Sequence, residues 1–199
     1  MNSPVYYTLI PSPLGQLLLT ATSRGLSGLW LAGEKHCPDP APEWQENPAV
    51  FTCVTTQLQE YFSGTRLTFD LPLDTSGTAF QQQAWAALQQ IPYGTTLTYQ
   101  QQATAMGRPG AVRAVGTANG RNPLSIVVPC HRVIGANGTL TGYGGGLPAK
   151  QWLLRHEATT RSFHQLAGVR FVSTIPALQM DHPLPQSTSS HHPVSLPPV

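Results

Sequence analysis

Apolar and polar residues alternate in three short runs near the N-terminus. The runs cover residues 5–10, 16–21 and 26–31, and turn sequences rich in glycine, proline and serine separate them. A period of two with closely spaced turns predicts a three-stranded antiparallel meander. The polar, proline-containing stretch at 33–47 is expected to form a loop.

The spacing of apolar residues becomes helical over 48–62, and Gly64 supplies a stop signal. The residues on this apolar face are Phe51, Val54, Leu58, Tyr61 and Phe62. Residues 67–71 alternate again and are predicted to form a short strand. We therefore expect residues 1–74 to be a small α/β domain with an antiparallel sheet.

Helix signals dominate the second half of the chain. Two capping boxes predict helices over about 79–90 and 99–106, the first from Thr78 with Gln81 and the second from Thr98 with Gln101. A further helix is expected to begin at Pro148. The fold class is thus mixed α/β, of α+β type, with a mainly helical domain over 75–175. Residues 176–199 are rich in proline, serine and histidine without periodicity, which predicts a disordered tail.

A short helix from Pro109 to about residue 119 follows the one at 99–106 after a tight turn. Two short helices in this arrangement are typical of a helix-turn-helix, and they place Arg113 and Thr117 on one face. Small residues on the second helix would allow a close approach to DNA. The alternative is an ordinary pair of packed helices.

The charge is distributed unevenly. Residues 1–74 hold three lysines or arginines and seven acids, whereas residues 75–180 hold eight basic residues and one acid, Glu157. A basic half is the pattern expected of a protein that binds a polyanion, and a solvated basic face is the alternative. A lone acid among so many bases is expected to pair with a cation or an imidazolium.

Three scattered cysteines, Cys37, Cys53 and Cys130, are too few for a disulfide framework, and no CxxC pair indicates zinc. Cys53 is expected to be inert packing on its helix. The first residues lack the features of a signal peptide, and no apolar run has the length of a membrane span. We therefore expect a cytoplasmic protein without metal, cofactor or membrane partner.

The candidate chemistry lies at 128–133, where Cys130, His131 and Arg132 are consecutive between apolar segments. An electropositive setting favours the thiolate, the nucleophilic form of cysteine. The hexapeptide alone leaves two interpretations open, a nucleophile and a packed core thiol.

The surrounding motifs resemble the 6-O-alkylguanine-DNA alkyltransferases, also called methylated-DNA–protein-cysteine methyltransferases. The resemblance spans about residues 80–158 and is specific because several separated motifs occur in order, with looser similarity in the N-terminal half. The motifs are Ile91-Pro92-Tyr93-Gly94, Thr98-Tyr99-Gln100-Gln101, Arg113-Ala114-Val115-Gly116, Asn122-Pro123, Pro129-Cys130-His131-Arg132, Gly142-Tyr143 and Trp152-Leu153-Leu154-Arg155-His156-Glu157.

The resemblance implies roles for five residues in the chemistry. Cys130 would accept the alkyl group, His131 would take its proton through a water, and Glu157 would orient His131. Tyr99 would assist the guanine leaving group, and Asn122 would brace the seat of the cysteine. A thioether has no easy leaving group, so each molecule would act once.

The resemblance also implies the partner, which is double-stranded DNA contacted in its minor groove by a monomer. Arg113 would fill the gap left by an extruded nucleotide. The implied DNA-binding residues are Arg113, Ala114, Gly116, Thr117, Arg121 and Tyr99. The implied base pocket is formed by Val133, Tyr143, Gly144 and Ser125. Ser125 and Asn119 stand where other members vary or carry proline, and Gly144 stands where some carry serine.

Two other functions remain open from the residues alone. A lesion-binding regulator would hold alkylated DNA without transferring the alkyl group, and the presence of Cys130, His131 and Glu157 together weighs against it. A cysteine hydrolase would turn over repeatedly on an acyl substrate, whereas a suicide transferase would stop after one equivalent.

Overall fold

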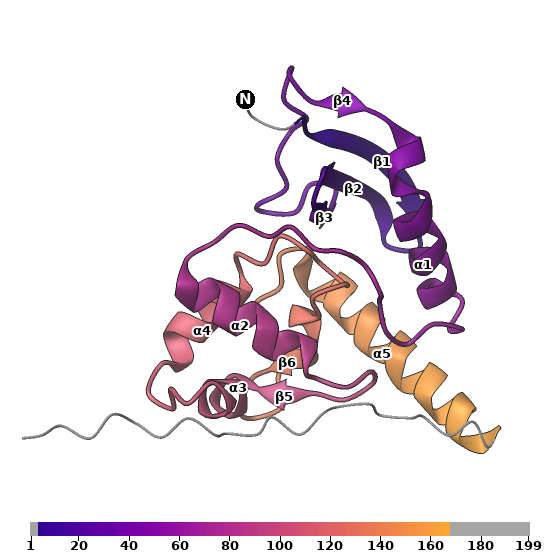
Figure 1. Cartoon of the computed structure of the whole chain (residues 1–199). Coiled ribbons are helices and arrows are strands. Elements are labelled where there is room, and N and C mark those ends of the chain that lie inside the picture. The colour runs from indigo at the N-terminus through magenta and orange to yellow at the C-terminus, as the bar shows by residue number, and fades with distance from the viewer. Residues whose placement is uncertain (1–3, 168–199) are drawn as a thin grey trace, which may run out of the picture.

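The computed structural model describes residues 4–167, so the predicted tail at 176–199 lies outside the described residues. The N-terminal part is a four-stranded sheet in the order β3-β2-β1-β4 with one helix beside it (Figure 1). The predicted meander is confirmed as β1 (Tyr6–Ser12), β2 (Gly15–Thr22) and β3 (Gly25–Leu31), paired antiparallel.

The loop predicted at 33–47 contains one further strand, the two-residue β4 (Gln45–Glu46), which pairs parallel with β1. Backbone bonds hold it: the Gln45 amide donates to the Val5 carbonyl at 2.9 Å, and the Asn47 amide donates to the Tyr7 carbonyl at 3.0 Å. A polar dipeptide carries no alternation, so the sequence pattern does not reveal it.

The helix predicted over 48–62 is present as a 3-10 turn, η1 (Pro48–Phe51), followed by α1 (Thr52–Phe62). Asn47 caps the first turn by accepting from the Ala49 amide at 3.2 Å. The apolar face of α1 buries Val54, Leu58 and Tyr61. Cys53 is exposed, so the expectation that it packs in the core is wrong.

The strand predicted at 67–71 is wrong, because these residues form no ladder. The side-chain amide of Gln57 replaces a partner strand: its Nε2 donates to the Asp70 carbonyl at 2.8 Å, and its Oε1 accepts from the Asp70 amide at 2.9 Å. Buried backbone groups need partners, but a side chain can satisfy them as well as a strand does.

Up to residue 167, the C-terminal part contains four α-helices: α2 (Ala79–Gln89), α3 (Tyr99–Ala105), α4 (Val112–Asn119) and α5 (Gly146–Leu166). Both predicted capping boxes are present in full. The helix expected at Pro109 begins later, at Val112, because residues 108–111 form a turn closed by the Ala111 amide and the Arg108 carbonyl. α5 begins at Gly146, two residues before Pro148. A proline is tolerated there because the first turn of a helix does not need its backbone N–H.

A short parallel pair, β5 (Leu97–Thr98) with β6 (Val133–Ile134), ties α3 to the candidate cysteine segment. That segment is a 3-10 turn, η2 (Cys130–Arg132). α3 and α4 pack through a buried amide pair, in which Asn119 Nδ2 donates to Gln102 Oε1 at 2.7 Å and Gln102 Nε2 donates to Asn119 Oδ1 at 3.1 Å. These contacts hold α3 and α4 against each other.

The two parts share one continuous core. The Leu29 amide of β3 donates to the Pro123 carbonyl, and the Ser125 amide donates to the Leu29 carbonyl, both at 2.8 Å. The N-terminal sheet therefore holds the segment that leads to Cys130. No helix among residues 4–167, including the long α5, has the length and apolar character needed to cross a membrane.

Candidate active site

Cys130 lies at the end of a tightly folded segment, residues 124–130. Backbone hydrogen bonds between residues two apart hold it: the Val127 amide donates to the Ser125 carbonyl, and the Cys130 amide donates to the Val128 carbonyl. Ile126 is fully buried with φ of 73°, a left-handed backbone that a β-branched residue rarely adopts. Such strain costs about 1–3 kcal/mol and persists where the surroundings impose it, as at many functional sites.

Asn122 holds this segment from inside. Its Nδ2 donates to the Val128 carbonyl at 2.8 Å and to the Cys130 sulfur at 3.3 Å, and its Oδ1 accepts from the Leu124 amide at 3.0 Å. The side chain is buried. Asn122 therefore fixes the position of the sulfur relative to the segment that carries it.

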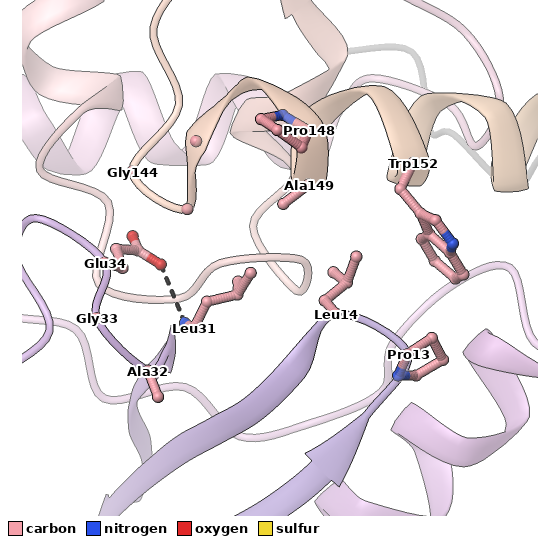
Figure 2. A pocket seen from close by; sticks show the side chains of 12 residues that line it. Pro13, Leu14, Leu31, Ala32, Gly33, Glu34, Gly144, Pro148, Ala149 and Trp152 are labelled. Atoms are coloured by element: carbon pink, nitrogen blue, oxygen red, sulfur yellow. Dashed lines mark hydrogen bonds between the residues drawn. The ribbon is translucent and has the colours of Figure 1, made fainter.

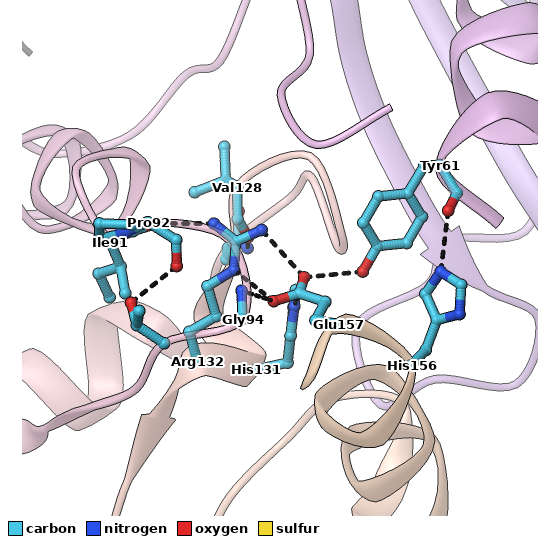
Figure 3. A network of polar contacts seen from close by, with 11 residues as sticks. Tyr61, Ile91, Pro92, Gly94, Val128, His131, Arg132, His156 and Glu157 are labelled. Atoms are coloured by element: carbon cyan, nitrogen blue, oxygen red, sulfur yellow. Dashed lines mark hydrogen bonds and ion pairs between the residues drawn. The ribbon is translucent and has the colours of Figure 1, made fainter. Parts of the chain in front are cut away.

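His131 and Arg132 meet Glu157, which projects from α5, in a buried network (Figure 3). Glu157 Oε1 lies 2.8 Å from His131 Nε2 and accepts from Arg132 Nη2 at 2.9 Å, while Oε2 accepts from Arg132 Nε at 2.9 Å. The pairing expected for this lone acid is thus present. Burial raises the pKa of Glu157, but its contacts with His131 and Arg132 outweigh that effect and hold the pKa well below its usual range.

The tautomer of His131 follows from this contact. An ionised carboxylate only accepts, so Nε2 must carry the proton, and Nδ1 is left as an acceptor. Nδ1 is buried and has no hydrogen-bond partner among the described residues. Burial lowers the pKa of His131 and keeps the ring neutral despite the opposing effect of Glu157. The site therefore holds a neutral imidazole with one nitrogen ready to take a proton.

The thiolate expected from the Cys-His-Arg sequence is not favoured in the free protein. Burial raises the pKa of Cys130 to about 11, and the Asn122 hydrogen bond offsets this only in part. The hydrogen bonds of Arg132 go to Glu157 and to the Ile91 carbonyl, not to the sulfur. Arg132 is close to Cys130 in the sequence, but in the folded protein its guanidinium is bound to other groups.

We expect iodoacetamide at pH 7.5 to label exposed Cys53 well before buried Cys130. Labelling of Cys130 should rise by up to tenfold per pH unit towards its pKa of about 11, because only the thiolate reacts. Peptide mass spectrometry measures both sites in one sample, so Cys53 is an internal control. Labelling of Cys130 as fast as Cys53 at pH 7.5 would contradict the raised pKa.

Lys150 is a buried residue of the site that the sequence analysis missed. Its Nζ donates to the Val133 carbonyl at 2.6 Å and to the Thr141 carbonyl at 2.7 Å, joining β6 to the loop before α5. Burial lowers the pKa of Lys150 to about 8, and a Cys130 thiolate would raise it again. Lys150 lies three residues before Leu153 and seven before Glu157, on the buried face of α5. This helical spacing was the sequence signal that could have identified it.

The other residues assigned to the base pocket surround the same loop. Tyr99 donates from its hydroxyl to the Thr141 carbonyl at 3.2 Å. The Tyr143 hydroxyl is shielded from solvent, and Val133 is fully buried. Ser125 and Gly144 both lie against Glu34, a residue of the N-terminal part.

The predicted DNA-binding residues lie on the outer face of α4 and just beyond it. Arg113, Ala114, Thr117 and Arg121 are exposed. Gly116 faces the Tyr99 ring, where an added Cβ would lie 3.8 Å from the ring atoms. The outer face of α4 therefore carries small side chains apart from Arg113. It adjoins the candidate active site at Tyr99.

Comparison with known proteins gives two adjoining matches. Residues 79–159 match the family model "6-O-methylguanine DNA methyltransferase, DNA binding domain", and residues 5–75 match the "ribonuclease-like domain" of the same family. The chain belongs to the 6-O-methylguanine DNA methyltransferase family.

The methylated-DNA–protein-cysteine methyltransferase of Methanosarcina barkeri is 49% identical over 154 residues, which are 77% of this chain and 97% of the relative. The protein of that name from Haemophilus influenzae is 44% identical over 154 residues, or 77% and 86%. A crystal structure of Mycobacterium tuberculosis OGT in complex with DNA is 46% identical, has a TM-score of 0.74, and covers 78% of this chain and 94% of its own.

One contact of this methyltransferase-family site crosses between the two family domains and was not foreseen. Tyr61 of α1 donates from its hydroxyl to Glu157 Oε1 at 2.8 Å, and the Gly94 amide donates to Oε2 at 3.0 Å (Figure 3). Tyr61 stood out in the sequence only as one apolar position of a helix. Among residues 4–167, no group of three or more histidines, cysteines or acids is placed to hold a metal ion.

Tyr61→Phe is expected to slow methyl transfer to Cys130 by about three- to tenfold. Removing one hydrogen bond to a charged group costs about 1.5–3 kcal/mol, and part of that loss falls on the orientation of His131. The measurement is the single-turnover rate on methylated duplex. Tyr93→Phe is the matched control, because the Tyr93 ring packs against Tyr61 but its hydroxyl is not among the donors to Glu157. Equal rates for Tyr61→Phe and wild type would show that the contact serves stability alone.

Proposed function

We propose that this protein repairs DNA by transferring the alkyl group of 6-O-alkylguanine, and less efficiently of 4-O-alkylthymine, irreversibly to Cys130. The observation that carries the proposal is the Cys130 sulfur held by Asn122 in the same 3-10 turn as His131, whose Nε2 is fixed by Glu157. A nucleophile, a base and a group that orients the base are the parts that such a reaction needs.

The transfer step conserves atoms and charge without a cofactor. The Cys130 sulfur forms a bond to the alkyl carbon while the bond from that carbon to guanine O6 breaks, and the electron pair of the broken bond remains on the guanine. The thiol proton leaves the sulfur and the guanine regains a proton at N1. The products are a neutral thioether and a normal guanine, and the stable thioether ends the activity of that molecule.

The raised pKa of Cys130 determines how the proton moves. A thiol with a pKa of about 11 is protonated at neutral pH, so deprotonation accompanies attack. We infer that His131 Nδ1 takes the proton through a water and that Glu157 stabilises the imidazolium. Lys150 favours the thiolate by its charge. Burial raises the pKa of Tyr99, which keeps its hydroxyl protonated as a hydrogen-bond donor to the leaving guanine.

The alkylated oxygen lies inside a duplex, so the nucleotide must be turned out to reach a buried sulfur. Arg113 on the exposed face of α4 is suited to occupy the vacated place from the minor groove, and the small residues beside it permit close approach. The DNA complex of the Mycobacterium tuberculosis relative supports DNA as the partner. Val133, Tyr143, Gly144 and Ser125 would then line the pocket for the base.

We further propose that the two domains have different roles. Residues 75–175 would bind DNA and carry the chemistry, while residues 1–74 would support the cysteine segment through β3 and Tyr61. One copy of the chain supplies every residue named in the reaction, so a monomer suffices. A substrate in chromosomal DNA implies a cytoplasmic location in a bacterial-type cell.

The test is incubation of the full chain with a duplex containing 6-O-methylguanine, followed by peptide mass mapping. One methyl group per molecule on the Cys130 peptide is expected, with none in Cys130→Ala. Tight lesion binding without methyl transfer by the wild type would instead support a regulator. Repeated turnover on an acyl substrate would support a hydrolase.

A further inference from the structure

Glu34, in the loop after β3, reaches from the N-terminal domain to two residues of the proposed base pocket. Ser125 Oγ donates to Glu34, lying 3.2 Å from both carboxylate oxygens. The carboxylate also occupies the space beside Gly144, where an added Cβ would lie 2.1 Å from Oε1. Figure 2 shows Glu34 between β3 and the Gly144 loop, at one end of a groove between the domains.

This carboxylate is not paired with a cation in the described part of the chain. Its other partner is the Leu31 amide at 3.1 Å, and no lysine, arginine or histidine of residues 4–167 forms an ion pair with it. Burial raises the pKa of Glu34, while the two hydrogen bonds oppose that effect. Its charge also acts at the reaction centre, since it contributes to the raised pKa of Cys130 and of Tyr143.

The three residues form a matched set. Glycine at 144 leaves the room that the carboxylate fills, and serine at 125 supplies a hydrogen-bond donor where a proline would supply none. The N-terminal domain thus places a negative charge against the pocket wall.

We propose that Glu34 is a specificity-determining residue that makes the pocket reject anionic alkyl groups, such as carboxymethyl, in favour of neutral ones of the same size. This rests on the proposed function, because Ser125 and Gly144 must border the alkyl group during transfer. A second carboxylate brought beside Glu34 would meet like-charge repulsion in a partly desolvated site. A neutral amide of the same shape would not, and it would find an acceptor in Glu34.

The test compares single-turnover transfer from duplexes carrying 6-O-carboxymethylguanine and 6-O-carbamoylmethylguanine, which differ in charge and hardly in size. The measured quantity is the carbamoylmethyl rate divided by the carboxymethyl rate. Glu34→Gln keeps the shape of the side chain and one acceptor oxygen but removes the charge, so this ratio should fall by about tenfold from the wild-type value. Intrinsic reactivity of the two adducts, and any change in the pKa of Cys130, cancel in that comparison.

Asp39→Asn is the matched control, because Asp39 is an exposed acid in the same loop, and it should leave the ratio unchanged. Glu34→Ala provides a second neutral variant and should lower the ratio as Glu34→Gln does. A ratio equal to wild type in the folded neutral variants would overturn the proposal for Glu34 while leaving methyl transfer intact. Absence of methyl transfer in the wild type would instead refute the proposed function itself.

Discussion

Replacing Glu157 by glutamine is expected to lower the free energy of unfolding by about 3–5 kcal/mol and to slow methyl transfer by at least about a hundredfold. The stability loss arises because Arg132 would keep its charge in a buried site without a counter-ion. The rate loss arises because His131 would lose the carboxylate that fixes its tautomer and stabilises its protonated form. Thermal unfolding and single-turnover kinetics measure the two effects.

The control for this change is Glu60→Gln. Glu60 also pairs with an arginine, Arg66, but the pair is partly exposed, and its loss should cost no more than about 1 kcal/mol. A loss of stability in Glu157→Gln as small as that of the control would show that the buried pair does not support the fold.

The pH dependence of stability gives a second test of Glu157. Its folded-state pKa is depressed, so its contribution is present above the unfolded value near 4.5 and disappears as the pH falls towards the folded value. Wild-type protein should therefore lose stability on acidification below about pH 4.5. Glu157→Gln should lack that part of the loss, which denaturant titrations at several pH values would measure.

Arg113→Ala is expected to slow methyl transfer from duplex DNA by about a hundredfold while changing the reaction with free 6-O-benzylguanine by less than about threefold. Extruding a nucleotide costs a few kcal/mol, and only the duplex substrate requires it. Each 1.4 kcal/mol of lost compensation slows the reaction tenfold. Arg113 is exposed, so stability should not change.

Arg155→Ala is the matched control for Arg113, because it removes an exposed positive charge from α5 instead of α4. It should affect the duplex reaction by no more than the loss of one general electrostatic contact. Equal losses with duplex and free base in Arg113→Ala would refute the role in extrusion, and equal effects of both variants would reduce that role to charge alone.

Features encoded within a few residues were predictable from the sequence. The two capping boxes and the β-meander are local patterns, and both are present. The prediction of a strand at 67–71 was wrong, because the Gln57 side chain takes the place of a partner strand. Alternation of apolar and polar residues indicates which face of a segment is buried, but it does not indicate which groups form hydrogen bonds with the backbone.

The site divides in the same way. Cys130, His131 and Glu157 were found from motifs, and the structure places His131 against Glu157. Glu34 and Tyr61 were missed because they lie 91 and 96 residues from their partners Ser125 and Glu157. The sequence predicted a cation beside the Cys130 sulfur, but the hydrogen bonds of Arg132 go to Glu157 and to the Ile91 carbonyl, because sequence neighbours do not determine where a guanidinium points.

The hydroxyl of Tyr61 on the Glu157 carboxylate has a consequence for how such proteins can be recombined. A chimaera that joins the N-terminal half of one relative to the C-terminal half of another must carry a matching donor at this position. Without one, the hybrid would inherit an intact Cys-His-Glu sequence and still react slowly. The two halves are therefore expected to be exchangeable only as compatible pairs.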